Sequence, residues 1–283
     1  MAEPTYSYLI ASTPRSGSTL LCEALRNTGV AGRPEEYYQH RRKTGLPRRP
    51  REYFEDGAET PEIFDVLGDY TRVDDELTLY DPRRFPSYRS YRDWTIQEAT
   101  TPNGVFGAKV MWGYFNGFVD SLRDLLGNAV LPTRKVLEQS FPNLEGWIFV
   151  SRSDKVRQAV SLWKAIQTWT WSRDSSDGHL LKHDLRYSFD GIDHLTRQLE
   201  DQDREWLAFF EESGIDAFAV VYEDFVQRYE GTALDILHHL GIAAPADVAF
   251  GQRRMTRQAD ERSERWVNQY RHDLEQRRAP TAM

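Results

Sequence analysis

Short apolar runs alternate with longer amphipathic segments along most of the chain. Four of these runs have the length and composition of buried strands, and they lie at residues 6–11, 104–112, 146–150 and 217–222. Apolar positions with helical spacing predict helices at residues 16–28, 114–126, 151–170, 189–213, 232–240 and 261–276. Strands that alternate with helices favour an α/β fold, with a mainly parallel central sheet that helices flank on both faces.

The segment between the first two strands has a less regular pattern. Residues 33–39 (RPEEYYQ) are expected to be extended. Residues 41–100 are rich in Arg, Pro, Tyr and Asp, with only a weak helical pattern at 61–70, so we expect a mostly helical insertion with loops there. Since no internal repeat or clear linker interrupts the chain, we expect a single domain over residues 1–283.

The composition and the net charge exclude several kinds of protein and of binding site. Apolar residues make up 40% and charged residues 28% of the chain, as in ordinary globular domains. A formal net charge of −8 argues against sequence-independent binding to nucleic acid. Cys22 is the single cysteine, which excludes an intramolecular disulfide and a cysteine-based zinc site and fits a reducing compartment. Without a basic leader or an apolar run of membrane-spanning length, we expect a cytoplasmic protein with no stable membrane insertion.

The turn between the first strand and the first helix (PRSGST, residues 14–19) has the composition of an anion site. The N–H groups at a helix N-terminus and the helix dipole attract negative charge. Gly17 lets a ligand approach the backbone closely, and Arg15 adds a fixed positive charge. The hydroxyl donors are Ser16, Ser18 and Thr19. The alternative is an ordinary capped helix start, with Ser16 as the N-cap and Arg15 in solvent.

The same turn departs from the phosphate-binding loop of ATPases. That loop reads GxxxxGK[ST], and residues 14–19 lack its first glycine, its lysine and its spacing. A kinase that uses ATP and magnesium is therefore disfavoured. No spacing of histidines and carboxylates indicates a metal site, so no metal is expected.

Five segments in the same order resemble sulfotransferases that use 3′-phosphoadenosine-5′-phosphosulfate (PAPS), and most closely the bacterial trehalose 2-sulfotransferase group. They are RSGSTLL (15–21), LRNTGVAGRPEEYYQ (25–39), TPNGVFGAKVMW (101–112), QAVSLWKAIQT (158–168) and RQADERSERWVNQYRHD (257–273). The resemblance implies a P-loop-like sulfotransferase fold, transfer of a sulfuryl group from PAPS to a hydroxyl, release of PAP, and a homodimer.

The resemblance also assigns the cofactor residues. The 5′-phosphosulfate loop corresponds to Arg15, Ser16, Gly17, Ser18 and Thr19, and the second phosphate site to Arg152 and Ser161. Arg152 follows a buried strand, where open α/β sheets bind ligands, and it can contact a phosphate bidentately. Ser161 could instead be a solvated helix position. Arg257 and Arg262 are weaker candidates for the same phosphate.

For catalysis, the resemblance places the general base at Glu36. Arg15 stands where the wider family usually has a lysine, and its place in the anion turn suits it to stabilise the negative charge that grows on the leaving phosphate. Only one of Glu35 and Glu36 should face the site, because adjacent side chains of an extended segment point in opposite directions. Two solvated carboxylates are the alternative. Lys109 could neutralise sulfonate oxygens or be an ordinary surface lysine.

The candidate acceptor site is where the sequence departs from the trehalose group. Its candidate residues are Arg33, Glu36, Tyr37, Gln39 and Tyr53, with the insertion 41–100 expected to shape it. Pro14 and Tyr53 differ from the trehalose group, so the acceptor could be trehalose, another sugar, a glycolipid or a natural-product hydroxyl. A non-catalytic nucleotide-binding protein is a further alternative. We expect Tyr222–Phe225 to serve packing and helix capping.

Overall fold

A computed structural model of the chain describes residues 3–39, 50–54, 84–168, 185–246, 248, 250 and 260–278. The chain divides into two compact units. The first comprises Met1–Pro47, Val73–Ser153 and Gln202–Gln252, and the second comprises Arg48–Arg72, Asp154–Asp201 and Arg253–Met283. The single domain expected from the sequence stays a prediction.

Within the described residues, the first unit contains one parallel sheet of four strands in the order β2-β1-β3-β4. The strands are β1 (Tyr6–Ser12), β2 (Val105–Met111), β3 (Leu144–Ser151) and β4 (Phe218–Val221). They match the four predicted apolar runs, and the parallel sheet is confirmed. Because all four run in the same direction, their carboxyl ends lie at one edge of the sheet.

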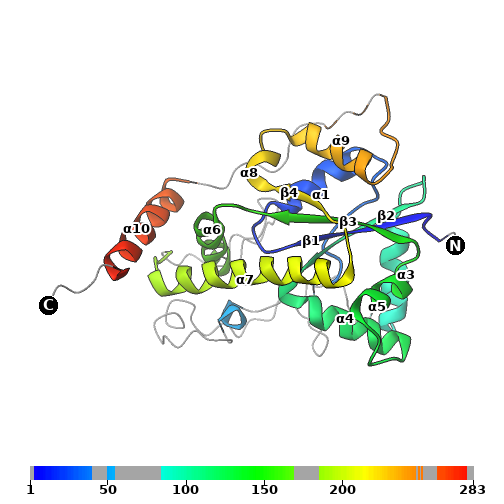
Figure 1. Cartoon of the computed structure of the whole chain (residues 1–283), viewed down its shortest axis with the longest axis horizontal. Helices are drawn as coiled ribbons and strands as arrows, with labels where there is room; N and C mark the ends of the chain where they lie inside the picture. Colours follow the sequence, from blue (N-terminus) through cyan, green and yellow to red (C-terminus); the bar gives the residue numbers. More distant parts are fainter. Residues whose placement is uncertain are drawn as a thin grey trace. The chain divides into compact units, whose positions relative to one another are not determined.

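Helices cover both faces of this sheet. Figure 1 shows α1 and α9 on one face and α4 and α5 on the other. The helices of the first unit are α1 (Ser18–Asn27), α3 (Tyr88–Ala99), α4 (Trp112–Leu126), α5 (Thr133–Ser140), α8 (Tyr222–Phe225) and α9 (Tyr229–His239). One residue from each of three strands, Leu9 of β1, Phe106 of β2 and Phe149 of β3, belongs to the core cluster that also contains the buried apolar residues of α4. Trp206, on the final turns of α7 (Phe189–Ser213), is buried in the same cluster.

The second unit packs α6 (Lys155–Thr168), α10 (Glu261–Arg278), the beginning of α7 and the short helix η1 (Pro50–Tyr53) around its own core. Trp163 is completely buried in this core, and its indole N–H donates to the carbonyl of Arg186. No helix among the described residues is long and apolar enough to cross a membrane.

The predicted helices α1, α4, α6, α7, α9 and α10 are confirmed with shifts of a few residues at their ends. The sequence pattern missed α5, an eight-residue helix that buries only Val136, Leu137 and Ser140, because so short a stripe has little periodicity. Within the predicted insertion the structure describes only 50–54 and 84–100, and the weak helical pattern at 61–70 lies outside the described residues.

Gly107 is expected to tolerate no side chain. A Cβ on this β2 residue would lie 2.6 Å from Cζ of Tyr8, which is completely buried and donates its hydroxyl to the carbonyl of Ala31. We predict that Gly107→Ala lowers the free energy of unfolding by about 1–3 kcal/mol through overpacking. Chemical denaturation measures this.

Gly117 on α4 provides the matched control, because a Cβ there would have no atom within 4 Å. Gly117→Ala should leave stability unchanged or raise it by up to about 1 kcal/mol through helix propensity. If both alanine variants lost the same stability, the packing of Tyr8 against β2 would be misdescribed.

Candidate active site

The turn between β1 and α1 has a strained backbone that suits an anion. Arg15 has φ 62° and Gly17 has φ 91°, both in the left-handed region. For Arg15 this conformation costs on the order of 1 kcal/mol, and such strain is found most often at functional sites. The N-cap of α1 is Gly17, without a side-chain cap. The alternative of Ser16 as N-cap is therefore wrong.

The Ser16 hydroxyl is buried, and among the residues that the structure describes it has no hydrogen-bond partner. A buried hydroxyl of this kind is costly unless a ligand or water satisfies it. Together with the N-terminal N–H groups of α1, it forms a donor set that fits a sulfate or phosphate group.

Two contacts from the end of α7 support the strand that leads into this turn. The Thr13 hydroxyl donates to Asp203 Oδ1 over 3.2 Å. The Trp206 indole N–H donates to the carbonyl of Ser12 over 3.0 Å. Since Ser12 and Thr13 are completely buried, these contacts hold the base of the turn in one position.

The segment after α1 runs beside β2 and carries Glu35 and Glu36, whose side chains point in different directions. The Lys109 N–H donates to the carbonyl of Glu35 over 2.9 Å, which fixes the segment against the strand. The Glu35 side chain pairs with Arg26 and is half exposed. The Glu36 side chain turns the other way, to Lys109, so only Glu36 reaches the buried site.

Lys109 connects Glu36 to the anion turn. Its Nζ lies 2.8 Å from Glu36 Oε2 and donates to the Thr19 hydroxyl over 3.1 Å. Lys109 is only 3% exposed, so the surface-lysine alternative is wrong. Burial is the largest single influence and lowers the pKa of Lys109, but the charge and hydrogen bond of Glu36, with smaller contributions from Cys22 and Glu35, together outweigh it, so the pKa of Lys109 is raised. The ammonium therefore stays charged.

The second carboxylate oxygen of Glu36 is available for chemistry. Oε1 is buried and has no hydrogen-bond partner within the described parts of the chain. The hydroxyl of Tyr114, at the start of α4, lies nearby. Burial raises its pKa well above the usual value, and the negative charge of Glu36 raises it further. A carboxylate held on one oxygen by Lys109 can accept a proton on the other.

Arg152 lies at the same edge of the sheet, directly after β3. Its guanidinium carbon lies 4.7 Å from the ring centroid of Tyr222, and its Nε lies 3.7 Å from Glu223 Oε1. The Ser153 N–H donates to Glu223 Oε2 over 3.0 Å. Packing and helix capping are the roles expected from the sequence for Tyr222 and Glu223, whereas their contacts with Arg152 were not predicted. Their place directly after β4 was the available signal.

Tyr222 also contacts the anion turn. A Cβ at Gly17 would lie 2.4 Å from Cδ2 of the Tyr222 ring, so the ring packs directly against this glycine. Tyr222 therefore lies between the two predicted anion-binding groups, the turn at residues 14–19 and Arg152.

The remaining candidates belong to two different units. Arg33 is exposed and donates to the carbonyl of Glu98, while buried Tyr37 donates its hydroxyl to the carbonyl of Arg33. Gln39 is partly buried. Ser161, Tyr53 and Arg262 belong to the second unit, on α6, η1 and α10 respectively. Arg257 lies outside the described residues.

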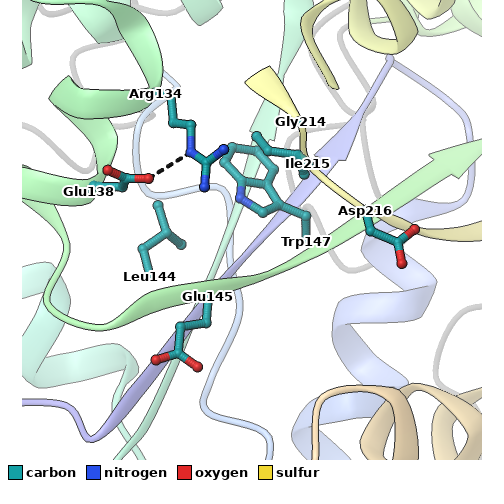
Figure 2. A pocket seen from close by; sticks show the side chains of 8 residues that line it. All are labelled: Arg134, Glu138, Leu144, Glu145, Trp147, Gly214, Ile215 and Asp216. Atoms are coloured by element: carbon teal, nitrogen blue, oxygen red, sulfur yellow. Dashed lines mark hydrogen bonds and ion pairs between the residues drawn. The ribbon is translucent and has the colours of Figure 1, made fainter. Parts of the chain in front are cut away.

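A pocket of about 310 Å³ lies elsewhere on the first unit. Figure 2 shows Trp147, Asp216 and the Arg134–Glu138 ion pair among its lining residues. It lies beside the start of β3 and the residues before β4, at the amino ends of these strands. Ligands of parallel sheets bind at the carboxyl ends, so this pocket is not the candidate site.

Comparison with known proteins agrees with this geometry. The model of the family described as "Stf0 sulphotransferase" matches residues 7–273. The chain belongs to this sulfotransferase family. It is therefore a sulfotransferase enzyme with a parallel α/β fold. Among the described residues no group of three or more His, Cys, Asp or Glu side chains could hold a metal ion.

Two curated relatives match over nearly their whole length. Trehalose 2-sulfotransferase of Mycobacterium tuberculosis is 33% identical over 293 residues, covering 99% of this chain and 100% of the relative. Trehalose 2-sulfotransferase of Mycolicibacterium smegmatis is 35% identical over 283 residues, covering 97% and 98%. A solved sulfotransferase domain of the Synechococcus PCC 7002 olefin synthase is similar with a TM-score of 0.37 and 16% identity, covering 96% of this chain and 89% of that domain.

The buried ion pair predicts a large effect of Lys109→Met on stability. The substitution keeps the length of the side chain but leaves the Glu36 carboxylate without its counter-charge, so we expect a loss of about 2–4 kcal/mol in the free energy of unfolding. Because the raised pKa keeps Lys109 protonated, the loss should be the same between about pH 7 and 9 and shrink only as the pH rises through that pKa.

Lys135→Met is the matched control, because Lys135 forms an exposed ion pair with Glu138 on α5. It should cost less than about 1 kcal/mol. Equal losses in the two variants, measured by urea denaturation, would mean that the Lys109 pair is not a buried one.

Proposed function

We propose that this sulfotransferase moves the sulfuryl group of PAPS to a hydroxyl of trehalose or another carbohydrate-containing acceptor, producing a sulfate ester and PAP. The observation that carries the proposal is the contact of one buried lysine with both Glu36 and Thr19. It joins a carboxylate able to act as a base to a turn able to hold an anion.

In this proposal the strained turn binds the 5′-phosphosulfate. Gly17 permits the left-handed backbone, and the Ser16 hydroxyl gains the hydrogen bond that it otherwise lacks. Ser18 and Thr19 begin α1, so their N–H groups lie at the positive end of the helix dipole. The Arg15 charge stabilises negative charge on the leaving phosphate oxygen.

Glu36 acts as the general base. Its Oε1 takes the proton of the acceptor hydroxyl as the new S–O bond forms and the bond from sulfur to the phosphate oxygen breaks. Lys109 keeps the carboxylate in place through Oε2. By analogy with phosphoryl transfer, we expect a loose transition state. Positioning of the substrates and stabilisation of charge then contribute more to the rate than activation of the attacking acceptor oxygen.

The second phosphate of the nucleotide is assigned to Arg152, with Ser161 as a further candidate. Arg152 is supported by its place after β3 and by its packing on Tyr222, which also contacts the anion turn. Arg33, Tyr37, Gln39 and Tyr53 remain candidates for the acceptor side. The homodimer and the cytoplasmic location implied earlier also stay predictions.

Trehalose is the first acceptor to test, because both curated relatives carry the name trehalose 2-sulfotransferase. Pro14 and Tyr53 differ from the residues of that group, so other sugars, glycolipids and natural-product alcohols belong in the same screen.

An activity assay tests the proposal directly. With PAPS and trehalose we expect a product heavier than trehalose by one sulfuryl group, detected by mass spectrometry, and release of PAP without added metal. PAP should also raise the melting temperature, because a ligand of the folded state stabilises it. A melting shift with ATP and magnesium but none with PAP would favour a kinase and contradict the proposal.

Glu36→Gln separates the base from the binding role. The amide cannot take a proton, so we expect kcat to fall by roughly 10²–10⁴-fold while the Kd for PAP stays unchanged. Glu35→Gln is the control, since Glu35 pairs with Arg26 on the other side of the segment, and it should retain near-full activity. Loss of PAP binding in Glu36→Gln would show that the base is misassigned.

A further inference from the structure

The carboxylate of Glu223 lies beside Arg152, and the groups that surround it resemble those of an anion-binding site. One carboxylate oxygen accepts the Ser153 N–H over 3.0 Å, and the other lies 3.7 Å from Nε of Arg152. A backbone N–H and a guanidinium that converge on one negative group are the donors that commonly bind phosphate. Glu223 therefore already presents a negative charge to Arg152, the residue that the proposed function assigns to a nucleotide phosphate.

The contact between Glu223 and Arg152 is loose. A separation of 3.7 Å between Nε and Oε1 allows charge attraction but exceeds the range of a hydrogen bond. The firm bond of the carboxylate goes to the Ser153 backbone, which fixes its position. An arginine held in this way is oriented by the carboxylate and can still exchange it for a stronger anion.

Tyr222 holds the guanidinium independently of Glu223. Its ring face lies 4.7 Å from the guanidinium carbon of Arg152, a cation–π distance. The Arg152 side chain is only 14% exposed. Arg152 therefore keeps its place when the charge of Glu223 is removed, and the carboxylate contributes mainly its charge.

We propose that Glu223 is an internal competitor for Arg152, a positioning residue that weakens the binding of the nucleotide phosphate and speeds the release of PAP. The inference rests on the assignment of Arg152 to a phosphate of the nucleotide. A phosphate carries up to two negative charges. It therefore repels the Glu223 carboxylate and competes with it for the Arg152 guanidinium. An enzyme that must release PAP in each cycle gains turnover from this weaker binding.

Glu223→Gln tests the proposal. The amide oxygen can still accept the Ser153 N–H, while the negative charge is lost and an NH2 group, which cannot attract the guanidinium, takes the place of the oxygen that faces Arg152. We expect the Kd for PAP, measured by titration calorimetry, to fall by roughly three- to tenfold, since the carboxylate is partly screened by solvent. Stopped-flow measurements should show most of the gain as slower dissociation. Unchanged or weaker binding of PAP would overturn the proposal.

Glu230→Gln is the matched control, because it removes the same charge from an exposed residue in the first turn of α9. It should leave the Kd for PAP unchanged. An equal gain in both variants would show a general effect of net charge and would overturn the role of Glu223.

A second control tests the pathway through Arg152. In an Arg152→Ala background, the gain from Glu223→Gln should shrink to less than about twofold, because coupled residues are not additive. A gain that persisted in full would contradict competition for Arg152. If the unmodified enzyme did not bind PAP, the proposed function would fail and this inference with it. If it did bind PAP but Glu223→Gln bound no tighter, only the inference would fail.

Discussion

The ion pair between Lys109 and Glu36 is the interaction on which the arrangement of the site depends. Burying two charges is unfavourable unless each is paired and hydrogen-bonded. Lys109 meets this condition with a carboxylate and a hydroxyl as partners, and its backbone N–H fixes the neighbouring Glu35. One residue thus joins β2, the segment after α1, and α1 itself. The same contacts that stabilise the pair determine where the base points.

The parallel sheet determines which residues can take part. The turn at residues 14–19, Lys109, Arg152 and the pair Tyr222–Glu223 each lie at or directly after the carboxyl end of a different strand. They are far apart in the sequence, and the common direction of the strands brings them to one edge. The helices that begin there, α1 above all, add N–H groups and a positive dipole to the same edge. The chemistry therefore follows from the topology.

The strands and long helices could be predicted from the sequence because burial repeats along them with a clear period. The separation of Glu35 and Glu36 followed from the geometry of an extended segment, though their resemblance to a known family was needed to choose between them. The environment of Lys109 could not be predicted, because it depends on a pairing between residues 73 positions apart along the chain. The contacts of Tyr222 and Glu223 with Arg152 could not be predicted for the same reason, since Arg152 follows a different strand, β3.

Gly17 illustrates how tightly such a site restricts change. Its backbone has a left-handed φ of 91°, and the Tyr222 ring fills the space that a side chain would need. Replacing Tyr222 with a smaller residue would make room for a methyl group at position 17 but would not remove the strain of its positive φ. The same replacement would remove the cation–π contact with Arg152. A side chain at this position would therefore both strain the backbone and displace the ring, so the residues allowed at 17 and at 222 depend on each other.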